Sequence, residues 1–247
     1  MTKDLGYDGV EVRGIENELY APNCGPFLPV NIEATKAILK EKNIEISCLT
    51  SASYIFDKKN IERQMKEGID YIFLAQSLGV KYVRVLGDEQ PYPGENINLD
   101  FVAANLKELA NYADGRDVTV LIETNGVFAD SKVLLSLLEK VNKPNVGVLW
   151  DIHHPYRYMN EPVKETYNRL KKYIQHIHIK DSVIEDGQVS YRMVGYGDLP
   201  IVEVLDLLKA DNYSQYISLE WVKRWDRTLE APAIAFPHFI NYVKRHI

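Results

Sequence analysis

The chain alternates short apolar runs with longer segments in which apolar residues recur every three or four positions. Short runs rich in β-branched and aromatic residues are typical of strands, and the longer periodic segments predict amphipathic helices. The predicted strands cover residues 9–13, 45–51, 81–87, 118–124, 146–152, 175–180 and 216–221, and the predicted helices cover 31–43, 58–79, 98–114, 131–142, 161–173, 200–210 and 230–246. Regular alternation of strands and helices indicates βα units that build a parallel sheet.

The strand pattern favours a barrel in which helices cover the sheet. Many of the strands are nearly continuous apolar runs, as expected where both faces of a sheet are buried. A length of 247 residues suits a single (β/α) barrel, so we expect one domain over residues 1–247. Only seven strands are found, and "KDLGYDG" before the first of them resembles a helix end with a glycine cap. We therefore predict a TIM barrel that lacks its first strand.

A missing strand would leave two strand edges unpaired. The barrel could be open there, the chain could start late, or a non-standard element could fill the gap. A partner copy could also cover the edges, which leaves a homo-oligomer as an open alternative. Residues 87–100 and 181–200 are predicted to be long loops, and such loops in compact domains are often functional. Within the second, "GYGDLP" is interpreted as a turn before a helix, with Asp198 as a candidate N-cap.

Composition narrows the classes of function. A net charge of −6 and a pI near 5.6 argue against a general nucleic-acid binder, which would carry a basic face. No apolar run reaches the roughly 18 residues that span a bilayer, and "MTKDLGYDGV" has no apolar signal-peptide core. Cys24 and Cys48 form neither a metal-type cluster nor a disulfide framework. We therefore expect a cytoplasmic protein whose partner is a small molecule rather than nucleic acid or a membrane.

Four consecutive predicted strands each carry one metal-binding side chain near the carboxyl end. They are Glu123, Asp151, His178 and Glu220. In a parallel barrel these ends share one rim, where active sites are built. An acidic residue in an apolar strand is costly unless it is paired or bound to a cation. Each residue alone is more often an ion-pair partner or a hydrogen-bonded histidine. All four on one rim favour a site for one divalent ion, Mn²⁺, Mg²⁺, Co²⁺ or Zn²⁺.

Several motifs, in this order along the chain, resemble the xylose-isomerase-like TIM-barrel superfamily, and in particular its sugar phosphate isomerase/epimerase branch. The motifs are "GYDGVEVR", "IET", "LWDIHHPYR", "HIHIKDS", "GYGDLP" and "ISLEW". The resemblance implies that Glu123, Asp151, His178 and Glu220 hold the family's divalent metal. It also implies that His154 contacts the substrate. The family often has histidine two positions after the first glutamate, where this chain has Asn125.

This constellation predicts proton transfer beside a carbonyl group. A metal bound to the carbonyl and hydroxyl oxygens of a sugar would stabilise the developing enediolate. Glu123 and Glu220 come from well-separated strands, so they are the candidate acid/base pair that removes and returns the proton. Asp151 and His178 would act as ligands only, and His178 would need an acceptor that orients its second ring nitrogen.

Other side chains near the predicted rim are candidate substrate contacts. They are His154, Lys180, Arg84, Glu11 and Trp221. The two cations could hold hydroxyl or phosphate oxygens, or could serve as ion-pair partners. Glu11 could instead pair with Arg13 inside the barrel mouth, and Trp221 could simply pack in the core. His153 and His154 are adjacent, so in an extended strand at most one of them would face the site.

Three alternative functions are considered: two stay open, and the composition opposes the other. An inosose or dehydroshikimate dehydratase would use a similar metal site and a similar enolate, and the sequence does not separate it from an isomerase. An apurinic endonuclease of the same superfamily is opposed by the acidic pI and by a total of only six histidines. A non-catalytic barrel that binds a sugar is the third alternative, and metal content would distinguish it from an enzyme.

Overall fold

A single sheet of seven parallel strands organises the computed structural model, which describes residues 1–247. The strands are β1 (Gly9–Val12), β2 (Glu45–Tyr54), β3 (Tyr82–Leu86), β4 (Thr119–Glu123), β5 (Val146–Asp151), β6 (Ile174–Ile179) and β9 (Ile217–Leu219). Their order in the sheet follows the chain, and every neighbouring pair is parallel. The sheet curls into a nearly closed TIM barrel, which confirms the predicted fold class.

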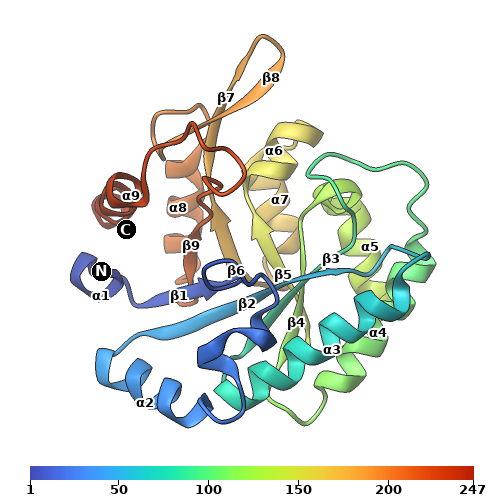
Figure 1. Cartoon of the computed structure of the whole chain (residues 1–247). Helices are drawn as coiled ribbons and strands as arrows, with labels where there is room; N and C mark the ends of the chain where they lie inside the picture. Colours follow the sequence, from blue (N-terminus) through green and yellow to red (C-terminus); the bar gives the residue numbers. More distant parts are fainter.

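Helices link the strands and form the outer layer around the sheet (Figure 1). They are α1 (Thr2–Leu5), α2 (Ile32–Lys42), α3 (Ile61–Leu78), α4 (Leu99–Ala113), α5 (Ser131–Val141), α6 (His153–Met159), α7 (Val163–Leu170), α8 (Ile201–Ala210) and α9 (Pro232–His246), with the short 3₁₀ helices η1 (Ala21–Asn23), η2 (Gly25–Phe27) and η3 (Gly126–Ala129). No helix is both long and apolar enough to cross a bilayer. The helices expected from periodicity all exist, with boundaries shifted by a few residues.

Burial and capping explain why these segments form their elements. Every residue of β3 and of β5 is buried, which matches their apolar runs and their position between helices and barrel interior. Asp130 caps α5 by accepting the backbone N–H groups of Lys132 and Val133. Gly79 ends α3 at φ 73°, a left-handed conformation that glycine adopts without steric cost. Trp150 of β5 is fully buried in the core, where its ring lies against Tyr167.

An open seam separates β1 from β9, the two strands at the ends of the sheet. The first strand of the chain is thus paired along one edge only, as predicted from the count of seven strands. A cavity of about 720 Å³ lies along the seam, between the two strands and α9. Helices α1 and α9 stand side by side next to it (Figure 1). The Tyr216 hydroxyl, directly before β9, donates to Glu45 Oε2 at the start of β2 at 2.8 Å.

Two elements appear where loops or strands were expected. Residues 181–200 were predicted to be a loop, but β7 (Asp181–Glu185) and β8 (Gln188–Arg192) form an antiparallel hairpin that projects from the barrel (Figure 1). Asp198 does not cap α8; its carboxylate pairs with Arg157. The strand predicted to extend over 146–152 ends at Asp151, and α6 begins at His153.

Candidate active site at the carboxyl rim of the barrel

The four side chains predicted as metal ligands lie together. Glu123 ends β4, Asp151 ends β5, His178 is the penultimate residue of β6, and Glu220 directly follows β9. One ligating atom from each residue lies within 4.8 Å of those of the others. We call these four residues the central cluster. Three of its members are buried, whereas the Glu220 side chain is 27% exposed and gives the cluster its access to solvent.

The imidazole of His178 has one ring nitrogen bound and the other free. Its Nε2 lies 2.8 and 2.9 Å from the two carboxylate oxygens of Glu11. Its Nδ1 is buried without a hydrogen-bond partner, 3.9 Å from Glu220 Oε1. Burial acts to lower the pKa of His178, but the carboxylates of Glu11 and Glu220 outweigh it and raise the pKa to about 9. A cation in the cluster would therefore compete with a proton on this ring.

The ammonium group of Lys180 lies among the carboxylates. Its Nζ contacts Asp151 Oδ2 at 2.5 Å and also forms an ion pair with Glu220. Burial opposes the charge on Lys180, but these two carboxylates raise its pKa well above the usual value. Glu220 shows the reverse: burial acts to raise its pKa, and the positive charges of Lys180 and His178 hold it below the ordinary value. The lysine therefore stays protonated and the glutamate ionised.

Hydrogen bonds fix the tautomer of His154. Its Nδ1 lies 3.0 Å from the carbonyl oxygen of Thr124, which can only accept a hydrogen bond. Its Nε2 lone pair then accepts from Lys180 Nζ at 2.9 Å. Burial, followed by the charge of Lys180, lowers the pKa of His154 to about 3. This ring is therefore neutral, and it presents an acceptor to the cation beside the cluster.

Arg84 pairs with the first glutamate of the cluster. Its Nε lies 3.2 Å from Glu123 Oε2, and its Nη1 donates to the carbonyl oxygen of Ser51 at 3.0 Å. Counting the neighbouring Glu11, four carboxylates meet three cations, Arg84, Lys180 and the protonated ring of His178, so one negative charge remains uncompensated. A divalent cation that takes the place of the ring proton of His178 would balance that excess, and the oxygen-rich donor set with the Nδ1 nitrogen of His178 fits such an ion.

The structure brings together eight of the nine residues singled out by the sequence. Arg84, Lys180 and His154 touch the central cluster directly, and Glu11 touches it through His178. Trp221 is half-buried, and its indole N–H donates to the carbonyl oxygen of Glu230 at 2.9 Å. Its role as a pocket wall stays a prediction. Arg13 does not pair with Glu11; its guanidinium donates to the carbonyl oxygen of Leu19.

Residues outside the predicted site also lie near it, among them His153, which was considered from the sequence but set aside in favour of His154. His153 contacts the Ser182 hydroxyl at 2.9 Å through Nε2, and its ring lies 5.5 Å from that of Tyr191 on the hairpin. Tyr158 of α6 lies 6.0 Å from the ring of His154. At the base of the hairpin, the Asp181 carboxylate accepts four backbone N–H groups, from residues 182, 195, 197 and 199. The hairpin is thus tied to the rim, and "GYGDLP" supplies the donors that hold it.

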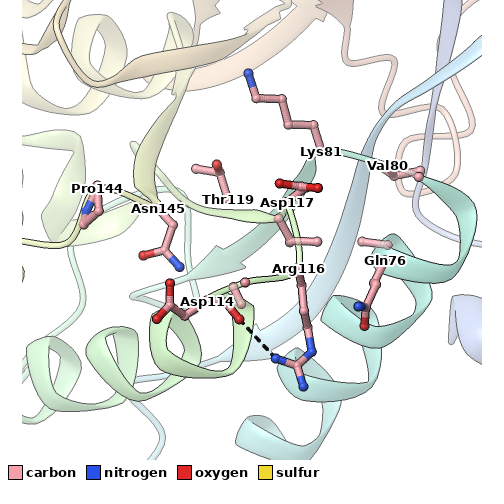
Figure 2. Close-up of a pocket in the computed structure, with 14 residues that line it drawn as sticks. Gln76, Val80, Lys81, Asp114, Arg116, Asp117, Thr119, Pro144 and Asn145 are labelled. Atoms are coloured by element: carbon pink, nitrogen blue, oxygen red, sulfur yellow. Dashed lines mark hydrogen bonds between the residues drawn. The ribbon is translucent and has the colours of Figure 1, made fainter.

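A second cavity, of about 730 Å³, opens at the opposite end of the barrel (Figure 2). Its lining includes Lys81, Thr119 and Asn145, which stand at or just before the amino ends of β3, β4 and β5. Arg116 donates there to the carbonyl oxygen of Asp114 at 3.2 Å (Figure 2). No group of three or more metal-binding side chains lies in this cavity. Since the amino-terminal face of a barrel mainly serves stability, the chemistry is concentrated at the other rim.

The chain belongs to the family described as "Xylose isomerase-like TIM barrel", whose model matches residues 1–236. This confirms the resemblance drawn from the motifs. Among curated proteins, fructoselysine 3-epimerase of Escherichia coli O157:H7 is 25% identical over 232 residues, which cover 89% of this chain and 82% of the relative.

Solved structures share the fold at low sequence identity. D-allulose 3-epimerase from Methylomonas sp. in complex with D-allulose superposes with a TM-score of 0.73 at 17% identity, over 100% of this chain and 88% of the other. A probable 3-DHS dehydratase from Bacillus anthracis has a TM-score of 0.76 at 15% identity, over 98% of this chain and 90% of the other. A xylose isomerase-like protein from Mycobacterium smegmatis in complex with magnesium has a TM-score of 0.73 at 15% identity, over 99% of this chain and 85% of the other.

Proposed function

We propose that this chain is a divalent-metal-dependent epimerase or isomerase that acts on a sugar or sugar phosphate. One observation carries the proposal: three carboxylates of the central cluster converge with the buried, unpartnered Nδ1 of His178. A buried nitrogen without a partner is costly, and a cation held by Glu123, Asp151, His178 and Glu220 would satisfy it. The uncompensated negative charge of the surrounding groups supports the same conclusion.

The chain's own residues would move the proton. A divalent ion in the cluster would supply positive charge next to a substrate carbonyl, which favours loss of a proton from the adjacent carbon. Glu220, the most exposed member of the cluster, would take the proton from one face. Glu123, paired with Arg84, would stand on the other face. A proton returned to the same carbon from the opposite face inverts its configuration, and one returned to the neighbouring carbon isomerises the sugar.

Substrate contacts would come from the polar groups around the cluster. Lys180 and Arg84 would donate to hydroxyl or phosphate oxygens, and the Nε2 of neutral His154 would accept a hydrogen bond from a hydroxyl. Trp221 stays a candidate contact as well. The similarity to the curated fructoselysine 3-epimerase supports epimerisation, rather than isomerisation, as the reaction of this chain. Elimination of a hydroxyl group from the same carbanion would make the protein a dehydratase.

Solvent deuterium incorporation tests this function directly. The chain, loaded with Mn²⁺, is incubated in D₂O with a panel of ketoses, ketose phosphates and inososes. We expect deuterium at a carbon next to the carbonyl of one substrate, and we expect Glu123→Gln and Glu220→Gln each to abolish the exchange while the fold is retained. Glu161→Gln is a matched control, because Glu161 is also buried but pairs with Arg169 and Thr166, outside the central cluster. Normal exchange in either cluster variant rejects its acid/base role, and loss of water from an inosose assigns the dehydratase instead.

A further inference from the structure

Glu11 crosses the interior of the barrel to reach two histidines. It stands on β1, at one side of the open seam, and its partners are His176 and His178 on β6. Its Oε2 lies 3.0 Å from His176 Nε2, and both of its oxygens lie within 2.9 Å of His178 Nε2. Both imidazoles are buried, and the glutamate side chain is only 13% exposed. One carboxylate therefore holds two neighbouring rings at once.

The chemistry of the carboxylate determines where the ring protons lie. An ionised carboxylate can only accept hydrogen bonds, so His178 must carry a proton on Nε2. In the neutral ring the lone pair is then on Nδ1, the nitrogen that faces Glu220 and has no hydrogen-bond partner. The same reasoning places a proton on Nε2 of His176, whose Nδ1 is also unpartnered. The second ring fixes the carboxylate from another direction, so its orientation does not depend on His178 alone.

We propose that Glu11 is a positioning residue for the central cluster. Glu11 holds the ring of His178 with its Nδ1 directed at the cation site, and His176 anchors Glu11 in this role. The inference rests on the proposed metal function and assigns Glu11 a task other than substrate contact. Outer partners that orient a metal-bound imidazole keep it in the binding tautomer and raise its basicity, and losing one typically weakens metal binding about 10- to 100-fold. Glu11→Gln removes one acceptor oxygen and offers an amide donor instead, which permits the ring of His178 to turn its lone pair away from the cluster.

Two readouts test the assignment without relying on turnover. The dissociation constant for Mn²⁺ alone is measured by calorimetry on the full chain. ¹⁵N NMR at a pH above the pKa of His178, where the ring is neutral, reports which of its nitrogens carries the proton. We expect Glu11→Gln to weaken Mn²⁺ binding about 10- to 100-fold and to increase the Nδ1-protonated form. Glu11→Asp keeps the carboxylate and should recover part of the affinity. Glu161→Gln, which removes another buried carboxylate, should leave the Mn²⁺ affinity unchanged.

The outcomes separate this inference from the proposed function. If Glu11→Gln and Glu11→Asp both bind Mn²⁺ as tightly as the natural chain and keep the Nε2–H tautomer, the positioning role is wrong while the metal function stands. An altered KM with unchanged Mn²⁺ affinity also overturns it, since that result assigns Glu11 to the substrate. If the natural chain binds no divalent ion, both proposals fall.

Discussion

Replacing Lys180 with methionine tests whether the carboxylates at the rim require a neighbouring positive charge for stability when no metal ion is bound. The ammonium Nζ is 2.5 Å from an oxygen of Asp151, whose side chain is fully buried, and it also pairs with Glu220. At an effective dielectric constant near 20, the first contact alone corresponds to a gross attraction of about 7 kcal/mol. The variant no longer has to desolvate an ammonium, so the net loss is smaller. Removing one partner of a buried pair typically costs about 3–5 kcal/mol, and we expect that loss for Lys180→Met without metal.

A divalent ion should reverse part of this loss. It brings the positive charge that methionine lacks, and in the variant no ammonium repels it. A ligand at 100 times its Kd stabilises a protein by about 2.7 kcal/mol, and the variant should gain more than the natural chain at the same ion concentration. Urea unfolding at pH 7, with chelator and then with Mn²⁺, measures both quantities through Trp150 in the core.

An exposed lysine provides the matched control. Lys171→Met breaks a surface pair with Asp211, in which both side chains are more than 40% exposed. Such a pair contributes less than about 1 kcal/mol, and Mn²⁺ should not change the effect of the substitution. A loss below about 1 kcal/mol for Lys180→Met in chelator would refute the buried-pair reasoning. An equal loss with and without Mn²⁺ would show that the ion does not bind beside this lysine.

Three further predictions concern pH, the hairpin and the core. Without metal, stability should fall on both sides of neutral pH. His154, with a folded pKa of about 3, loses about 2 kcal/mol of stability by pH 5 because only the unfolded chain takes up the proton, and burial lowers the pKa of His153 in the same direction. His178, with a folded pKa of about 9, loses a similar amount by pH 8 because only the unfolded chain releases its proton, and urea midpoints across pH 5–8 would check both limbs. Asp181→Asn should lower stability by about 2–3 kcal/mol and expose residues 181–192 to limited proteolysis, since an amide offers one acceptor oxygen to four backbone donors. Gly87→Ala should cost about 1–3 kcal/mol in thermal unfolding, because its Cβ would lie 2.2 Å from the Phe128 ring.

The parts of the site that the sequence predicts well are those set by local pattern. An acidic or histidine side chain at the end of an apolar run is visible in the sequence, and parallel strands put such ends on one rim. That logic brought Glu123, Asp151, His178 and Glu220 together correctly. The hairpin was missed although a signal was present: Asp186-Gly187 is a two-residue turn of the kind that joins antiparallel strands, and both residues have positive φ.

Contacts that depend on barrel closure were beyond the sequence. Glu11 was considered together with Arg13, its neighbour on the same strand, because alternation relates residues within one strand only. Its actual partners are 165 and 167 positions away, and they become adjacent only when the sheet curls. The start of α6 directly after β5 was missed for a related reason. The predicted strand covered 146–152 and no helix was predicted at 153–159, where the local pattern gave no helix signal and only tertiary packing reveals one.

If the proposed cation binds, the seam beside β1 would link metal affinity to the stability of the chain's first strand. β1 is four residues long and is fastened to the sheet along one edge, so it is a natural place for local opening. When it swings out, Glu11 leaves His178, and the ring loses the partner that aims it. By thermodynamic reciprocity, an ion bound at the rim would slow hydrogen exchange of the β1 amides, although it touches none of them. The open side of the barrel would thus be a site of local unfolding that ion binding suppresses.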